Sequence, residues 1–296
     1  MIARVPASSA NLGPGFDTLA LALSLYLEVE AEESDRFQVS AFGEGSELEI
    51  NDEHLGARVA RKVLGHSRVH LTIRSQIPLG RGLGSSAAFV SACSAALGAE
   101  DPFLVAAGFD GHPENAAASV FGGFVTATAI NSKFVSRGLD VDPDLAAVAV
   151  IPYKELATKT ARGVLPKMVS LEDATFNLGR MGLLVSGLGD LGTLVAEATH
   201  DRLHQSYRSA LFPESAEILS ALTTAGAIAS CWSGAGPTMI GFCRSSRAPE
   251  VSKTLEQLLN GSEVSFRIEN LNVDYHGLRL AKSYGPDFQP LEVASL

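Results

Sequence analysis

An alternating run of residues gives way to an alanine-rich stretch at Pro78-Leu79-Gly80-Arg81-Gly82-Leu83-Gly84-Ser85-Ser86-Ala87-Ala88. The alternation over residues 69–73 predicts a strand, and residues 86–97, closed by a glycine, predict a helix. Glycine permits left-handed backbone and lets a ligand approach closely. Because successive N–H groups at a helix N-terminus donate hydrogen bonds to phosphate oxygens, the segment predicts an anion-binding loop. A purely structural turn with serine caps is the alternative.

This glycine loop differs from two widespread phosphate-binding patterns. No lysine precedes Ser85 and Ser86, so the loop is not of the G-x-x-x-x-G-K-[ST] type. Its ending also differs from the G-x-G-x-x-G dinucleotide fingerprint. The loop alone therefore does not identify its ligand, and the rest of the chain has to be considered.

Strand and helix patterns surround the loop. Alternation over residues 19–29 predicts a long strand, and residues 37–41 predict its antiparallel neighbour. Residues 121–130 predict a buried strand, which a polar, turn-prone junction follows at residues 131–143. In the second half, strands are predicted at residues 145–151, 227–231, 239–243 and 264–268, with helices around 218–222 and 251–259. This order suits a ferredoxin-like half-domain. The polar tail from residue 282 is expected to be loosely held.

Composition and charge restrict the class of protein. The 296 residues suit two domains, which we place at residues 1–143 and 144–296. Apolar residues make up 46% of the chain, which is typical of a globular protein. The net charge of −10 argues against nucleic acid or an anionic membrane as a partner. Three cysteines without a C-x-x-C pair, and no apolar signal core at the N-terminus, make the cytoplasm the expected location.

Two further glycine and serine motifs accompany the loop. Residues 6–17 read P-A-S-S-A-N-L-G-P-G-F-D, and residues 233–238 read S-G-A-G-P-T. Three such motifs in this order resemble the GHMP kinases and, among them, the homoserine kinases, although Ser8 stands where threonine is usual. Residues 110–115 (D-G-H-P-E-N), 158–166 (T-K-T-A-R-G-V-L-P) and 201–208 (D-R-L-H-Q-S-Y-R) are similar to further segments of these kinases. The resemblance covers residues 6–238, most of the chain.

The resemblance implies a fold and an activity. The fold would be the α+β, two-domain GHMP kinase fold, with an N-terminal mixed α/β domain like domain 2 of ribosomal protein S5 and a ferredoxin-like C-terminal domain. The activity would be transfer of the γ-phosphoryl group of ATP to the hydroxyl of L-homoserine, with Mg²⁺ as a cofactor. By resemblance only, the protein could also form a homodimer.

The resemblance also assigns an ATP site. The loop over residues 78–88 would wrap the triphosphate, and Ser86 would bind Mg²⁺ together with an acidic side chain, Asp110. Gly234 and Gly236 would lie beside the loop and support it. His54 would stand at the adenine pocket, although a surface histidine in a polar stretch is the alternative.

For the substrate, the resemblance offers groups of both charge signs. Asp17 would bind the ammonium, and Arg162 and Arg208 the carboxylate. Asn11, His112 and Asn115 would surround the hydroxyl end, and Thr158 would reach toward the transferred phosphoryl group. The candidate catalytic residues are thus Asn115, Thr158 and Arg162, without a dedicated base. Turn-forming roles for Asn11 and Asp17, and a helix-surface charge for Arg162, are the alternatives.

The sequence departs from the family pattern at two acidic positions. Asp110 stands where glutamate is usual, and Glu114 where aspartate is usual. The carboxylate that binds the metal is therefore left open among Asp110, Glu114, Glu100 and Asp101. Two other functions are also left open: a GHMP-type kinase for another small alcohol, such as mevalonate or a sugar, and an inactive binding protein that kept the fold.

Overall fold

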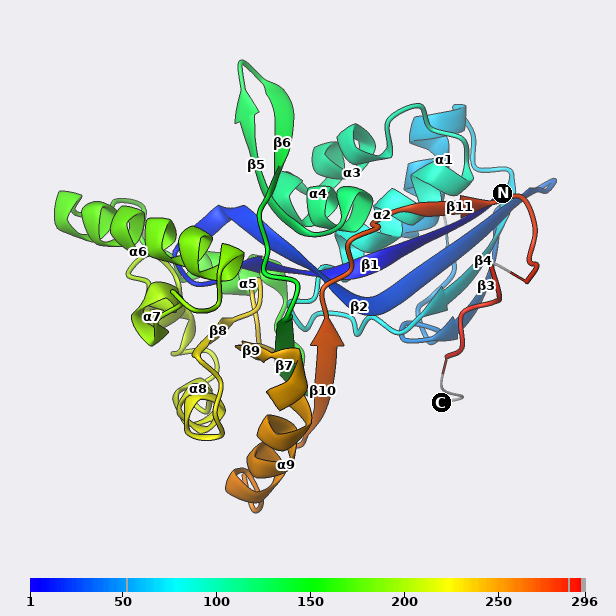
Figure 1. The fold of residues 1–296 in the computed structure, drawn as a ribbon. Coiled ribbons are helices and arrows are strands. Elements are labelled where there is room, and N and C mark those ends of the chain that lie inside the picture. Colours follow the sequence, from blue (N-terminus) through cyan, green and yellow to red (C-terminus); the bar gives the residue numbers. More distant parts are fainter. Residues whose placement is uncertain (52, 287, 294–296) are drawn as a thin grey trace.

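The protein is described by a computed structural model that covers residues 1–51, 53–286 and 288–293, apart from the side chain of Asp110. Within these residues, two sheets are built from eleven strands (Figure 1). The larger sheet has the order β11-β1-β2-β4-β3, and a hairpin of β5 and β6 joins it through β2. Its strands are β1 (Ile2–Asn11), β2 (Gly15–Glu33), β3 (Gln38–Gly43), β4 (Val69–Ser75), β5 (Phe124–Ile130), β6 (Lys133–Leu139) and β11 (Arg279–Ala281).

The smaller sheet is antiparallel and has the order β10-β7-β9-β8. Its strands are β7 (Leu145–Pro152), β8 (Ala229–Trp232), β9 (Met239–Arg244) and β10 (Phe266–Asn272). Every residue of β7 is buried, which fits a central strand covered on both faces. The predicted ferredoxin-like strand order of the second half is confirmed.

Helices pack on both sheets. In the first half they are α1 (Leu55–Leu64), α2 (Ser85–Ala96), α3 (Pro102–Asp110) and α4 (Pro113–Phe121). In the second half they are α5 (Thr158–Gly163), α6 (Leu171–Gly189), η1 (Ala196–Thr199), α7 (Gln205–Arg208), α8 (Ser215–Thr224), η2 (Ser245–Arg247) and α9 (Ala248–Leu258). Helices α1 to α4 gather on one side of the larger sheet (Figure 1). No helix in the described ranges is long and apolar enough to cross a bilayer.

The middle of β2 joins the core of the molecule. Residues 19–23 are buried without alternation, because α2 and α4 contact β2 while β10 also packs against it. Helix α2 is buried along its length from Ala87 to Ala96, and its small side chains let it lie close to β1 and β2. This packing fixes the helix N-terminus, where the glycine loop ends.

One predicted strand pairing is wrong. We expected residues 37–41 to pair antiparallel with the long strand, but β3 pairs in parallel with β4, and β4 pairs with β2. Helix α1 lies between β3 and β4 in the chain. Parallel neighbours need such a crossover, so the helix between the two strands sets their direction.

The expected strand at 121–130 and the expected junction at 131–143 are both partly wrong. Helix α4 runs through Phe121, and a Gly122-Gly123 turn with left-handed backbone separates it from β5. Most of the junction is strand β6, which forms a hairpin with β5. The turn between them is Asn131-Ser132, both with positive φ, as two-residue hairpin turns require.

The prediction of a loosely held tail is also wrong. Just before this tail, strand β11 pairs with β1. Within the tail, the Tyr284 hydroxyl donates to Glu28 Oε1 at 2.7 Å, and Gln76 Nε2 donates to the Glu292 carbonyl at 2.8 Å. The tail thus lies against the larger sheet.

The division of the chain into domains at residues 143 and 144 stays a prediction. Strand β11, from the end of the chain, belongs to the sheet of the first half.

Candidate active site

Two of the predicted substrate residues flank the turn between β1 and β2. Asn11 and Asp17 have φ of 68° and 52°, which lie in the left-handed backbone region that residues other than glycine rarely adopt. The Asn11 amide holds the turn, because its Oδ1 accepts the Asp17 N–H at 3.0 Å and its Nδ2 donates to the Gly234 carbonyl at 2.8 Å. Strained residues held in this way often mark functional sites.

The glycine loop needs its glycines for two reasons. Gly80, Gly82 and Gly84 all have positive φ, and Gly84 caps the N-terminus of α2. A Cβ on Gly82 would lie 2.1 Å from the carbonyl oxygen of Ser233. Only glycine therefore allows this loop to touch the turn between β8 and β9.

The three motifs of the sequence interlock. Ser233 Oγ lies 2.7 Å from the Gly82 carbonyl oxygen and 2.8 Å from Ser9 Oγ. The Gly234 N–H donates to the Ala10 carbonyl at 2.9 Å, and the Ser8 N–H donates to the Leu83 carbonyl at 3.2 Å. The second half of the chain thus holds the glycine loop and the β1–β2 turn together.

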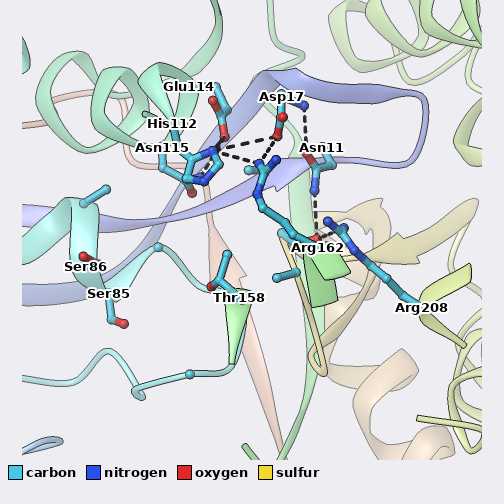
Figure 2. Close-up of a pocket in the computed structure, with 17 residues that line it drawn as sticks. Asn11, Asp17, Ser85, Ser86, His112, Glu114, Asn115, Thr158, Arg162 and Arg208 are labelled. Carbon is cyan, nitrogen blue, oxygen red and sulfur yellow. Dashed lines mark hydrogen bonds and ion pairs between the residues drawn. The ribbon is translucent and has the colours of Figure 1, made fainter. Parts of the chain in front are cut away.

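A cavity of about 110 Å³ opens where the motifs meet (Figure 2). Figure 2 shows the serines at the start of α2 on one side and the two arginines on the other. The cavity is lined by Ala10, Asn11, Asp17, Gly80, Gly82, Gly84, Ser85, Ser86, Ala87, His112, Glu114, Asn115, Thr158, Arg162, Arg208, Gly234 and Ala235. The structure therefore brings the predicted substrate residues to one place.

The two arginines reach this cavity from different helices, α5 and α7. Arg162 Nη2 donates to Asp17 Oδ1 at 2.5 Å and to His112 Nδ1 at 2.9 Å. Arg208 is only 1% exposed, and its Nη1 donates to the Gly234 carbonyl at 2.8 Å. Both guanidinium groups lie over the Phe16 ring, at 5.5 and 5.6 Å from its centre. Burial, aided by the charge of Arg162, lowers the pKa of Arg208 to about 10.

Glu114 is the buried acid of the site. Burial raises the pKa of its carboxyl to about 7, and the charge of Asp17 adds to the rise. Its Oε1 accepts from Asn115 Nδ2 at 3.0 Å, whereas Oε2 is buried without a hydrogen-bond partner among the described residues. Ligand atoms of Asp17, His112 and Glu114 lie within 4.8 Å of one another. An unpartnered carboxylate oxygen on a residue that shares its cavity with the serines at the start of α2 fits Mg²⁺, which prefers oxygen ligands.

Asn115 and Thr158 complete the cavity wall. Asn115 bridges two neighbours, because its Oδ1 accepts from the Ser8 hydroxyl at 2.9 Å while its Nδ2 donates to Glu114. Thr158 is exposed at the first position of α5 and lies between the two serines and the two arginines in Figure 2. Both residues therefore line the same cavity, and their predicted roles toward the hydroxyl and the phosphoryl group stay predictions.

A second cavity of about 300 Å³ adjoins the first and shares Gly80, Ser85 and Ser86 with it. Its other lining residues are mostly apolar: Leu27, Val39, Ala41, Glu44, Gly45, Ser46, Leu48, Ile50, His54, Leu55, Ile73, Ser75, Leu79 and Phe89. His54 caps α1, since its Nδ1 accepts the Gly56 N–H at 3.0 Å, and its ring packs against Phe37 and Phe89. Burial lowers the pKa of His54. The cavity has the apolar walls that a purine base needs.

Some predicted residues lie elsewhere. Arg81 turns away and donates to Glu155 Oε1 at 2.8 Å. Asp101 caps α3 by accepting the Leu104 N–H at 2.9 Å, and the exposed Glu100 lines neither cavity. The Asp110 side chain lies outside the described residues. Four other residues that were predicted to bind ATP or to support the loop also line neither cavity: Pro78, Leu83, Ala88 and Gly236.

Sequence reasoning missed His204 and Phe16. His204 is fully buried, and its Nδ1 accepts from Arg208 Nη1 at 2.9 Å. The spacing of four between these two residues in the D-R-L-H-Q-S-Y-R segment could have shown that they meet on one helical face. Phe16 had no comparable signal, because its contacts come from two distant helices.

Comparisons with known proteins identify the family of the chain. The GHMP kinases N terminal domain family matches residues 54–123, and the GHMP kinases C terminal family matches residues 182–260. A homoserine kinase from Moorella thermoacetica is 38% identical over 93% of this chain and 98% of its own length. A homoserine kinase from Thermus thermophilus is 41% identical over 85% of this chain and 89% of its own length.

Solved structures share the fold. A homoserine kinase from Cytophaga hutchinsonii has a TM-score of 0.79 at 24% identity and covers 94% of this chain and 96% of its own. L. major mevalonate kinase in complex with R-mevalonate has a TM-score of 0.71 at 16% identity, covering 92% of this chain and 95% of its own. The predicted fold class is confirmed. By its domains, its relatives and its fold, the chain belongs to the GHMP kinase family and, within it, to the homoserine kinases.

Proposed function

We propose that this protein transfers the γ-phosphoryl group of ATP to the hydroxyl of L-homoserine, with Mg²⁺ as the metal. The observation that carries the proposal is a small cavity that holds both charge signs beside the glycine loop. Asp17 supplies an anion, and Arg162 and Arg208 supply two guanidinium groups. An amino-acid zwitterion needs both signs, whereas a sugar needs neither.

Each charged group has a role in this proposal. Arg208 and Arg162 bind the substrate carboxylate, for which the planar guanidinium is the best-suited side chain. Asp17 binds the ammonium through Oδ2, since its Oδ1 already accepts from Arg162. Asn11, His112 and Asn115 then surround the hydroxyl end, and Thr158 faces the phosphoryl group.

Phosphoryl transfer asks mainly for positioning and charge neutralisation. The N–H groups of the glycine loop and of the start of α2 would bind the triphosphate, and the apolar second cavity would take adenine. We assign no general base. The chain's own contribution is to hold the acceptor hydroxyl in line with the phosphoryl group.

For Mg²⁺ we propose Ser86 and a carboxylate, of which Glu114 fits by its unpartnered Oε2; Asp110 stays the prediction made from sequence. The ion would neutralise charge on the transferred phosphoryl group. Glu114→Gln should raise the Mg²⁺ concentration for half-maximal rate by about tenfold or more, and Ser86→Ala should lower kcat similarly. Glu100→Gln is the matched control, because that exposed residue lines neither cavity. A Glu114→Gln variant with normal Mg²⁺ dependence would move the metal ligand to Asp110.

The function is tested by following ADP release from ATP with a panel of acceptor alcohols. L-homoserine should be required for steady turnover and should yield its O-phosphate, identified by mass spectrometry. Turnover with mevalonate or galactose instead would make the chain a GHMP-type kinase for another alcohol. ATP binding without turnover on any acceptor would make it a binding protein.

The remaining expectations stay predictions: a homodimer, a cytoplasmic location, and no nucleic-acid or membrane partner. Light scattering of the purified protein would test the first of these by its mass in solution.

A further inference from the structure

His204 contacts Arg208 without lining the cavity, and its hydrogen bonds fix its protonation state. Its Nε2 is 2.7 Å from the Gly13 carbonyl oxygen, which can only accept, so Nε2 carries the hydrogen. Its Nδ1 is 2.9 Å from Arg208 Nη1, which can only donate, so Nδ1 is the acceptor. These two contacts allow only the neutral ring with its hydrogen on Nε2.

The surroundings of the ring agree with this state. The ring is fully buried, with Phe16 at 5.3 Å between ring centres and Asp201 Oδ2 at 3.7 Å from Nε2. Burial lowers the pKa of His204 to about 4; the charge of Asp201 opposes this shift, and the charge of Arg208 contributes to it. The ring therefore stays uncharged across the physiological range of pH.

The contact determines which part of Arg208 can meet a ligand. Both hydrogens of Nη1 are taken, by His204 Nδ1 and by the Gly234 carbonyl at 2.8 Å, and Nε is 3.5 Å from the Ala161 carbonyl. Among the described residues, Nη2 has no hydrogen-bond partner, and Arg208 lines the cavity. The guanidinium is thus held in one orientation with one nitrogen left for an anion.

His204 also ties this guanidinium to the turn that carries Asp17. Gly13 lies in the β1–β2 turn, between Asn11 and Asp17, so the ring bridges the turn and α7. The groups that meet the two charged ends of the substrate are thereby held at a fixed separation.

We infer that His204 is a positioning residue, which acts through Arg208 to orient the guanidinium toward the substrate carboxylate. The inference rests on the proposed function. A merely structural role would affect all substrates alike, whereas this role predicts a loss confined to acceptors that carry a carboxylate.

Two substitutions separate the contacts of the ring. In His204→Gln the longer amide can still donate to the Gly13 carbonyl but leaves no acceptor near the position of Nδ1. In His204→Asn the amide oxygen stands near that position and keeps the acceptor for Arg208. His200→Gln is the matched control, because His200 is exposed in the same segment and does not line the cavity.

The readout is the ratio of kcat/KM for L-homoserine to kcat/KM for 3-amino-1-propanol, which lacks the carboxylate. We expect His204→Gln to lower this ratio by about tenfold through KM for homoserine, since a buried charged group loses a partner. His204→Asn should lower it by less than about threefold, and KM for ATP should stay near wild type. A folded Gln variant with the wild-type ratio, or with equal losses on both acceptors, would overturn the inference.

A second measurement needs no variant of uncertain folding. Long-range ¹⁵N–¹H NMR of the wild type should show His204 as the neutral tautomer with hydrogen on Nε2 from pH 5 to 8. A ring with hydrogen on Nδ1, or a charged ring, would also overturn the inference. A wild type that phosphorylates neither acceptor would contradict the proposed function itself, whereas normal wild-type selectivity with an unaffected Gln variant would contradict only the role of His204.

Discussion

Arg208 is a charged side chain with almost no exposure, and such a charge is stable only if polar partners replace its water. The partners here are a neutral histidine and a backbone carbonyl, neither of which is an anion. Arg162, by contrast, is 35% exposed and already pairs with Asp17. A substrate carboxylate would therefore stabilise the charge of Arg208 more than that of Arg162. Substitutions of the two arginines should accordingly change KM for homoserine to different extents.

The first prediction follows from this difference. Arg208→Lys should raise KM for homoserine by about 30- to 150-fold, or about 2–3 kcal/mol, because lysine cannot keep the contacts to His204 and Gly234 that hold one charged nitrogen toward the carboxylate. Arg162→Lys should act in the same direction with a smaller effect. Steady-state kinetics should find KM for ATP nearly unchanged in both. Arg180→Lys on α6, which does not line the site, is the control. Unchanged KM for homoserine in both site variants would contradict the pocket described above.

At the scale of elements, local sequence patterns predicted most strands and helices but did not predict how distant strands pair. The alternation of residues 37–41 indicated a strand but not its partner, because direction depends on the intervening α1. Strand β6 was missed because the sequence 131–143 is polar and its hairpin is exposed along much of its length. The glycine loop and the helix that follows Gly84 were predicted well, because the signals for the turn, the cap and the alanine-rich helix lie within a few residues of one another in the sequence.

Two glycines with similar backbone give a matched test of the loop. Gly82 and Gly98 have φ of 73° and 82°, but only Gly82 faces a close neighbour, the Ser233 carbonyl. Gly98→Ala should cost about 1 kcal/mol for the left-handed backbone alone. Gly82→Ala should cost about 3 kcal/mol or more and should raise KM for ATP, because the loop must move. Urea unfolding with ATP kinetics would measure both. Equal stability of the two variants would show that the loop and the β8–β9 turn do not touch as described.

At the scale of the molecule, the site forms only when both halves of the chain meet. The motifs indicated which residues would take part, because the resemblance matched them one by one. They did not indicate that Asp17 pairs with Arg162 or that His204 supports Arg208, since these contacts join segments more than 100 residues apart or involve a residue that does not line the cavity. The apolar wall of the second cavity was also missed, because it collects single residues from several elements.

The larger sheet contains a buried ion cluster that joins its first strands to the tail. Glu28 is fully buried, with Arg4 Nη2 at 2.6 Å, Arg74 Nη1 at 3.6 Å and the Tyr284 hydroxyl at 2.7 Å. Glu28→Gln would leave two arginines without their anion and should lower the free energy of unfolding by about 3–5 kcal/mol. Arg247→Gln, in an exposed pair with Glu250, should change it little, because water and salt screen such pairs. Urea unfolding measures both, and equal losses would contradict a structural role for the cluster.

The central claim is that one cavity recognises both charged ends of homoserine, and substrate selectivity of the wild type tests it most directly. The measurement is kcat/KM for L-homoserine beside 3-amino-1-propanol, which lacks the carboxylate, and 4-hydroxybutanoate, which lacks the ammonium. The account predicts that each analogue is poorer by about 100-fold or more, since each lacks one of the two charged groups that Arg208 and Asp17 would bind. An analogue without the carboxylate that reacts as well as homoserine would contradict it.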